Sequence, residues 1–227
     1  MGKMAANEVA QEQWRRWLVE GADALGIDLD EGKIGQLTAF AKELAAARQL
    51  VNLTSVEDPL EIAENLMLDS MAPGKFIQPG ASVLDLGTGA GIPGIPLKIA
   101  FPELDLTLID GRRKRINFVK YVSRALGLSH IAAEQIRAEA LAARNEKFDV
   151  VVSRAVSSMQ DLISLASPLL KPGGRLMAMK GRGYESEMDA AGLSSHEPVK
   201  GLDMRIEKYR LPRLGIDRFL VMVKLTA

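Results

Sequence analysis

The stretch SVLDLGTGAGIPGIPL, residues 82–97, joins a short apolar run to a loop in which glycine stands at every second position. Gly87, Gly89 and Gly91 carry no Cβ, so the loop can adopt positive φ angles and a ligand can lie directly against its main chain. Pro93 has no N–H and presets a helical φ, which favours the first turn of a following helix. The stretch therefore predicts a strand, a ligand-binding loop and a helix, in that order.

An alternation of strands and helices continues from this stretch to the end of the chain. We predict helices that begin near Pro93, Lys114 and Met159, a short helix or turn at 139–147, and strands at 82–87, 105–110, 130–136, 149–155 and 175–181. This spacing is typical of right-handed βαβ units and a parallel sheet. The last two alternating segments, 204–212 and 214–225, are joined by Pro and Gly and predict an antiparallel hairpin.

Helical periodicity precedes the alternating region. Apolar residues recur at helical spacing over residues 7–50, where we predict two helices, and Trp14 and Trp17 lie on a face that we expect to pack against the sheet. A third helix is predicted over 59–71, because Asp58 can cap it and proline occupies its first position.

The predicted elements form one α/β unit. We expect a single domain over residues 1–227, made of an N-terminal helical extension at 1–72 and a cofactor-binding and catalytic core at 80–227.

The composition excludes several classes of chemistry. The 227 residues include no cysteine, which rules out disulfides, thiolate zinc sites and cysteine nucleophiles, and with only two histidines we expect no metal site. The start lacks a signal peptide and no window resembles a membrane span, so we predict a cytoplasmic protein without a membrane partner. We also expect a monomer, because no long apolar stripe is left over.

The glycine loop is compatible with two kinds of cofactor. Residues 89–94 satisfy the G-x-G-x-x-G dinucleotide fingerprint, and Asp110 follows about twenty residues later, where a carboxylate can accept hydrogen bonds from ribose hydroxyls. Read from Asp85, the same loop is D-x-G-x-G-x-G, which resembles the first motif of class I S-adenosylmethionine methyltransferases. A nicotinamide fold would repeat its βαβ half, whereas five parallel strands followed by a hairpin favour the seven-stranded methyltransferase sheet.

Further motifs carry a closer likeness. NLTS at 52–55, LDS at 68–70, LDLGTGAGIPGIPL at 84–97, FDVVVSRAV at 148–156 and MKG at 179–181 occur in this order. Together they resemble the glucose-inhibited division protein B family. This resemblance implies a Rossmann-like class I fold, with a mostly parallel seven-stranded sheet behind N-terminal helices. It also implies an enzyme that transfers a methyl group from S-adenosylmethionine to N7 of a guanine in the decoding-region loop of 16S rRNA.

The resemblance also implies roles for single residues. It places the cofactor at Asp85, Gly87, Gly89, Gly91, Ile92, Asp110, Ala138, Glu139 and Arg154. Arg154 and Lys180 follow the fourth and fifth strands, and we predict them to be the catalytic residues. One departure is Leu66, which stands where members often carry a histidine.

The expected chemistry needs no general base, because guanine N7 has a lone pair and no proton. Proximity and orientation can then supply most of the acceleration. Arg154 could bind phosphate, guanine or the cofactor carboxylate, and the sequence leaves these three alternatives open. For the RNA or the small ribosomal subunit we predict phosphate contacts, which give affinity rather than sequence choice, from Arg112, Arg113, Lys114, Arg115 and Arg182, with Arg205, Arg210 and Arg213 as further candidates.

Three rival functions remain open. The chain could methylate a small molecule or a protein, it could be a binding module that kept the cofactor fold without turnover, or it could be a nicotinamide dehydrogenase. The intact loop with Asp85 and Asp110 argues against the second, and the C-terminal hairpin argues against the third.

Overall fold

The computed structural model describes residues 2–51, 58–154, 158–193 and 201–225. For residues 2–9 and 48–51 it describes the backbone alone. The NLTS segment at 52–55 and His196 lie outside the described residues.

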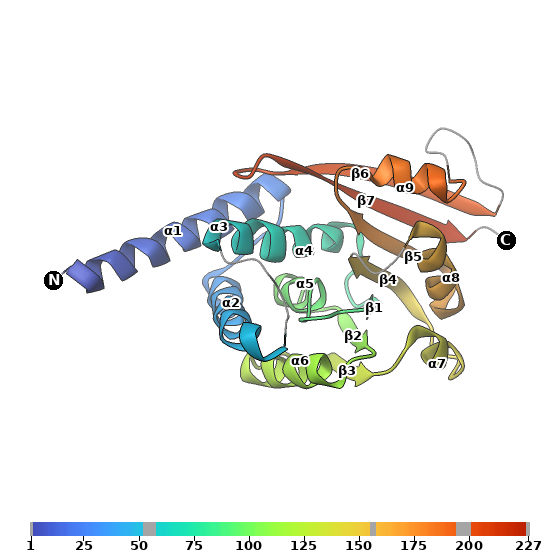
Figure 1. Cartoon of the computed structure of the whole chain (residues 1–227), viewed down its shortest axis with the longest axis horizontal. Helices are drawn as coiled ribbons and strands as arrows, with labels where there is room; N and C mark the ends of the chain where they lie inside the picture. Colours follow the sequence, from blue (N-terminus) through green and yellow to red (C-terminus); the bar gives the residue numbers. More distant parts are fainter. Residues whose placement is uncertain (1, 52–57, 155–157, 194–200, 226–227) are drawn as a thin grey trace.

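A single sheet organises the fold. In the described part of the chain it contains seven strands in the order β3-β2-β1-β4-β5-β7-β6 (Figure 1). Their bounds are β1 Ser82–Leu86, β2 Asp105–Asp110, β3 Ile131–Gln135, β4 Phe148–Arg154, β5 Leu170–Lys180, β6 Leu202–Leu211 and β7 Ile216–Leu225. The first five strands run parallel, and β7 pairs antiparallel with both β5 and β6. The predicted arrangement of five parallel strands and a C-terminal hairpin is confirmed.

Helices cover both faces of this sheet (Figure 1). On one face lie α1 Gly2–Leu25, α2 Glu31–Val51, α5 Gly94–Ala100 and α6 Arg113–Ala125, together with a continuous helical run made of α3 Pro59–Glu61, η1 Ile62–Leu68, α4 Asp69–Met71 and η2 Ala72–Phe76. On the other face lie α7 Ala138–Ala142, α8 Met159–Ala166 with the short turn η3 Ser167–Leu169, and α9 Tyr184–Ala190. None of the described helices is long and apolar enough to cross a membrane.

The period-two alternation of the strands creates two apolar cores. Val83 of β1 packs into the core under α1, α2, α5 and α6, whereas its neighbour Leu84 packs into the core under α7, α8 and α9. The N-terminal helices share the first core with the sheet, and Trp14 of α1 donates a hydrogen bond from Nε1 to Thr38 Oγ1 of α2 at 2.9 Å. The predicted packing of this tryptophan face is confirmed, while the proposed division of the chain at residues 72 and 80 stays a prediction.

The helical run after Asp58 departs from an ordinary α-helix. Asp58 caps it as predicted, because its Oδ1 accepts hydrogen bonds from Leu60 N at 2.9 Å and Glu61 N at 3.0 Å. From Ile62 to Leu68, however, the run has π-helical pairing. The α-helical part ends at Met71 as predicted, and a 3-10 helix continues the run to Phe76. A π turn widens the helix, and such turns are frequent at functional sites.

One predicted boundary was wrong by several residues, and Pro93 and His130 each lie one residue before the element they were expected to open. β5 begins at Leu170, five residues earlier than expected, because the LKPGG segment forms an irregularity inside the strand, where the register with β4 shifts. Pro93 is the residue before α5 and not its first helical residue. His130, expected to open a strand, has a φ of 49° and lies just before β3.

The π segment anchors the C-terminal hairpin. Glu64 is fully buried, and its two carboxylate oxygens accept hydrogen bonds from Arg213 N and Leu214 N, both at 2.8 Å. These amides belong to the turn between β6 and β7 and come from the opposite end of the chain. One side chain therefore connects the N-terminal helices to the last two strands.

Replacing this carboxylate should destabilise the protein. We expect Glu64→Ala to lower the free energy of unfolding by about 2–4 kcal/mol, because two turn amides lose a buried charged acceptor. Urea unfolding at neutral pH measures the change. Glu61→Ala, one turn earlier and exposed, is the matched control and should change stability by less than about 0.5 kcal/mol. Equal losses in the two variants would contradict the anchoring role.

Candidate functional site

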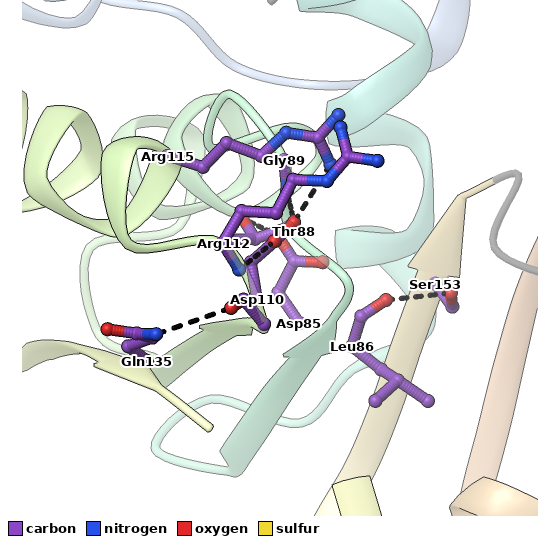
Figure 2. A network of polar contacts seen from close by, with 10 residues as sticks. Asp85, Leu86, Thr88, Gly89, Asp110, Arg112, Arg115, Gln135 and Ser153 are labelled. Carbon is purple, nitrogen blue, oxygen red and sulfur yellow. Dashed lines mark hydrogen bonds and ion pairs between the residues drawn. The ribbon is translucent and has the colours of Figure 1, made fainter. Parts of the chain in front are cut away.

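A buried carboxylate shapes the glycine loop. Asp85 of β1 is fully buried on the face that α5 covers, and its Oδ2 accepts hydrogen bonds from Thr88 Oγ1 at 2.6 Å and Gly94 N at 2.8 Å (Figure 2). Gly87 N and Thr88 N both donate to Ile109 O at the end of β2. These hydrogen bonds fix the start and the end of the loop and connect it to β2.

The environment of Asp85 changes its acidity. Burial raises the pKa of Asp85 to about 7, against the opposing effect of the hydrogen bonds from Thr88 and Gly94. Its second oxygen, Oδ1, has no hydrogen-bond partner among the described residues. The side chain is fully enclosed, so its contribution is to hold the loop rather than to contact a ligand.

Two glycines in the loop serve different purposes. A Cβ on Gly91 would lie 2.5 Å from Cγ1 of Ile95, so this position lets the loop pack against its own helix. A Cβ on Gly89 would find no atom closer than 3.9 Å, so this position leaves the main chain open to a ligand. Ile92 N donates to Thr88 O at 2.9 Å, and the Ile92 side chain packs against the first core.

The second carboxylate of the site is Asp110 at the end of β2. Its Oδ2 accepts hydrogen bonds from Gly89 N and from Arg115 Nη1, both at 3.1 Å, and its Oδ1 accepts one from Arg112 N at 2.8 Å (Figure 2). A carboxylate can accept about four hydrogen bonds, so Asp110 has capacity left for a ligand hydroxyl. The contacts hold it in one orientation beside the open stretch of the glycine loop.

A pocket of about 330 Å³ opens next to these two loops. Its apolar wall comes from the ends of β1 and β2 and from α7 and α8, and its polar rim includes Asp110 and Glu139; the lining residues are Leu86, Gly87, Ile109, Asp110, Gly111, Arg112, Ile136, Arg137, Ala138, Glu139 and Leu165. The volume is in the range of small-molecule sites. A partly apolar slot with the Asp110 carboxylate on its polar rim has the chemistry to accept a nucleoside, and the open main chain at Gly89 leaves room for a group that extends along the loop.

The two residues expected to be catalytic lie on opposite faces of the sheet. Arg154, at the end of β4, faces the first core, and its Nη2 lies 3.5 Å from Oδ2 of Asp69. Lys180, at the end of β5, faces α9, and its Nζ donates to Glu187 Oε1 at 2.5 Å. Lys180 is nearly buried in this ion pair, and its catalytic role stays a prediction.

The predicted RNA-binding residues fall into two groups. Arg112, Arg113, Lys114 and Arg182 are exposed. Arg115 is less exposed, because its Nη1 pairs with Asp110 Oδ2 at 3.1 Å, and its contact with RNA stays a prediction. The further candidates are paired with carboxylates: Arg205 with Glu207, Arg210 with Asp217 and Arg213 with Glu20.

Sequence reasoning missed a group of polar residues around Arg154. Asp69 of α4 lies between Arg154 and Arg218 of β7, and it also accepts a hydrogen bond from Tyr209 of β6. Asp69 belongs to the quoted LDS segment, but nothing in the sequence pairs it with a residue 140 positions away. Leu66, at the position where the family often has histidine, is buried in the first core.

The sheet order, the reversed β7, the glycine loop after β1 and the carboxylate after β2 together define a class I S-adenosylmethionine-dependent methyltransferase. Residues 33–198 match the family model for GidB, rRNA small subunit methyltransferase G. The chain belongs to this family.

Relatives and solved structures agree with this assignment. The chain is 35% identical to the ribosomal RNA small subunit methyltransferase G of Geotalea uraniireducens, over 95% of this chain and 99% of the relative. It is 37% identical to the protein of the same name from Salmonella arizonae, over 89% and 94%. Among solved structures, TrmN from Thermus thermophilus matches with a TM-score of 0.57 at 19% identity, over 76% of this chain and 55% of that one. A ribosomal protein L11 methylase from Lactobacillus delbrueckii matches with a TM-score of 0.51 at 17% identity, over 72% and 79%, and these two likenesses show the fold alone.

The acidity of Asp85 gives a testable pH dependence. Between about pH 4 and pH 7 the folded carboxyl keeps a proton that the unfolded one has released, so the free energy of unfolding should fall as pH rises, by at most about 1.4 kcal/mol per pH unit. Asp85→Asn cannot titrate, and its amide oxygen can still accept both hydrogen bonds. Urea unfolding at several pH values gives the free energy of unfolding of both proteins. The value for the wild type minus the value for Asp85→Asn should therefore decrease from about pH 4 to pH 7.

Other carboxylates titrate in both proteins and cancel in this difference. Asp105→Asn, an exposed carboxylate on β2, is the control and should show no such trend. A difference that stays flat from pH 4 to pH 7 would contradict the raised pKa.

Proposed function

We propose that this chain transfers a methyl group from S-adenosylmethionine to N7 of a guanine in the decoding-region loop of 16S rRNA. Family membership carries the proposal: relatives at 35–37% identity over more than 90% of the chain are named for methylation of small-subunit ribosomal RNA. A ribosomal substrate also places the reaction in the cytoplasm. The nucleoside-shaped pocket supports the methyl donor, and the exposed cations near it support a polyanionic acceptor.

The cofactor would be held by the residues that surround the pocket. Asp110 would accept hydrogen bonds from the ribose hydroxyls, and the apolar wall beside Ala138 and Glu139 would hold the adenine. The main chain of the loop at Gly87, Gly89 and Gly91, followed by Ile92, would run along the rest of the molecule. When bound, S-adenosylmethionine supplies an electrophilic methyl group on its sulfonium.

The chain's own contribution is orientation. Guanine N7 presents a lone pair and no proton, so no residue has to act as a general base, and a well-aligned complex can supply several kcal/mol of the barrier reduction. Arg154 stands at the end of β4, the strand beside β1, and is the charged group best placed to contact the acceptor or the far end of the cofactor. Lys180 would instead hold α9 in place through Glu187.

The RNA would approach over the exposed cations. Arg112, Arg113 and Lys114 begin α6 directly beside the pocket, and Arg182 follows β5 at the same edge of the sheet. Contacts of this kind with phosphate bind without choosing a sequence and weaken as salt rises. The choice of one guanine would then come from the shape of the rRNA loop at the site.

A methylation assay tests the proposal. Small ribosomal subunits from a bacterium that lacks the corresponding gene are incubated with the protein and methyl-labelled S-adenosylmethionine, and the labelled nucleoside is identified by mass spectrometry. We expect 7-methylguanosine at one 16S rRNA position. Asp110→Asn should reduce the rate of methylation at least about tenfold, because it places an amide donor against the N–H groups of Gly89 and Arg112. Asp105→Asn, at the other end of β2, is the control and should leave the rate unchanged.

Two outcomes would contradict the proposal. Label on another base or atom would overturn the N7 assignment. Cofactor binding with no labelled RNA, and label on a protein or small molecule instead, would show that the chain is a methyltransferase with a different acceptor.

A further inference from the structure

A buried polar cluster lies beside the proposed methyl-transfer site, at the carboxyl edge of the sheet. It brings together Asp69 from α4, Arg154 from β4, Tyr209 from β6 and Arg218 from β7, with Asn65 from the π segment at its border. These residues are separated by up to 153 positions of chain. In Figure 1 the helical run that contains α4 lies alongside the β6–β7 hairpin.

The cluster carries more positive than negative charge. Arg154 Nη2 and Arg218 Nε each lie 3.5 Å from the same oxygen, Oδ2 of Asp69, which is almost completely buried. Two guanidinium groups repel each other, so they stay side by side only while one carboxylate serves both. Within the described residues, Arg154 Nη1 has no hydrogen-bond partner, so the ion pair between Nη2 and Asp69 is the contact that fixes this guanidinium.

The other oxygen of Asp69 is fixed by a tyrosine. Tyr209 donates a hydrogen bond from its hydroxyl to Asp69 Oδ1 at 2.6 Å. Burial and the adjacent Asp69 raise the pKa of the Tyr209 hydroxyl, so it stays protonated and remains a donor at working pH. Arg218 is held separately, because its Nη2 donates to Asn65 Oδ1 at 2.8 Å. Arg154 has no such second contact among the described residues.

The end of β4 is fixed to the cofactor loop. Ser153 donates from Oγ to Leu86 O at 2.9 Å, and Leu86 is the last residue before the glycine loop (Figure 2). The backbone of Arg154 is therefore set by this contact, whereas the direction of its guanidinium is set by Asp69. A charged group in this place can affect transfer strongly, since misplacement of about 1 Å can cost on the order of 100-fold in rate.

We propose that Tyr209 is a positioning residue for methyl transfer: its hydroxyl orients Asp69, and Asp69 holds the guanidinium of Arg154 at the site. Tyr209 touches neither the glycine loop nor the pocket, so it acts through Arg154. The inference rests on the proposed rRNA methylation, and it assigns a role to a residue that is distant in sequence from every motif of the chain.

The variant Tyr209→Phe tests this role, because it removes one hydroxyl and keeps the ring that packs against the first core. At saturating cofactor and subunits we expect kcat for rRNA methylation to fall about tenfold, with KM for the subunits within about twofold. Tyr121→Phe, the same change at an exposed position on α6, is the matched control and should keep wild-type kcat. Melting temperatures of both variants show whether the fold is kept.

A double-mutant cycle separates positioning from general stability. If Tyr209 acts through Arg154, then Tyr209→Phe should slow Arg154→Ala by less than about twofold, whereas a structural role would give the same factor in both backgrounds. A second readout, by NMR, does not depend on activity. The Nε–H resonance of Arg154 is assigned by its loss in Arg154→Lys. This resonance should be sharp in the wild type, and in Tyr209→Phe it should be averaged towards the chemical shift of a free arginine.

The outcomes distinguish the two proposals. Unchanged kcat in Tyr209→Phe, or full additivity with Arg154→Ala, would overturn the positioning role while leaving rRNA methylation intact. A wild-type protein that methylates no rRNA would overturn the proposed function, and the Arg154 resonance would then decide alone whether Tyr209 orders this side chain.

Discussion

The site depends on a carboxylate placed where the sheet requires an apolar side chain. Asp85 occupies a position on β1 that faces the first core, two residues after Val83, and nothing on that face gives it access to water. Burial of an ionisable group is costly unless its hydrogen bonds are satisfied. Here Thr88 and Gly94 satisfy one oxygen, and the contact forces the chain between them to fold back over the end of β1. Gly91 follows from this constraint, since a Cβ there would lie 2.5 Å from Cγ1 of Ile95, whereas Gly89 leaves the main chain open.

At the carboxyl edge of the sheet, the pocket and the polar cluster around Asp69 lie on opposite faces. The pocket that fits a nucleoside opens toward α7 and α8, while the polar cluster around Asp69 lies under the helical run 59–76 and the hairpin. In the proposed role of Arg154, the C-terminal hairpin contributes to the site through Tyr209 and its contact with Asp69. Glu64 fixes its turn and Tyr209 reaches from its outer strand to the helix, so the N-terminal and C-terminal ends of the chain both support the end of β4.

The elements with a local signal could be predicted from the sequence. Glycine spacing marked the loop, period-two alternation marked the strands, and Asp110 was found by its distance from the loop and its place at the end of an apolar run. The boundaries that failed, at β5 and around Pro93, depend on a register shift and on the exact turn that precedes a helix. The π turn could not be predicted, because the apolar residues of Ile62–Leu68 differ in spacing from those of an α-helix by no more than one residue.

Contacts between distant residues account for the remaining differences. Arg115 belongs to a basic run and was expected on the surface, but its place on the first turn of α6 brings it to Asp110. Lys180 was predicted at the end of the fifth strand, but nothing in the sequence indicated that Glu187 of α9 would pair with it. Tyr209 is one of several alternating residues in β6, and only the assembled sheet shows that it faces Asp69. Sequence therefore predicted the loop and the strand ends that carry the candidate residues, and the fold determined which of their charges are paired.

The measurement that tests the central role of Asp85 most directly is the affinity for S-adenosylhomocysteine by isothermal titration in Asp85→Asn and Asp85→Ala. Asparagine can keep the hydrogen bonds from Thr88 and Gly94, whereas alanine removes both. If Asp85 acts by holding the loop, Asp85→Asn should bind within about threefold of the wild type and Asp85→Ala at least about tenfold more weakly. An equal loss in both variants would show that the negative charge of Asp85, and not its hydrogen bonds, makes the cofactor site.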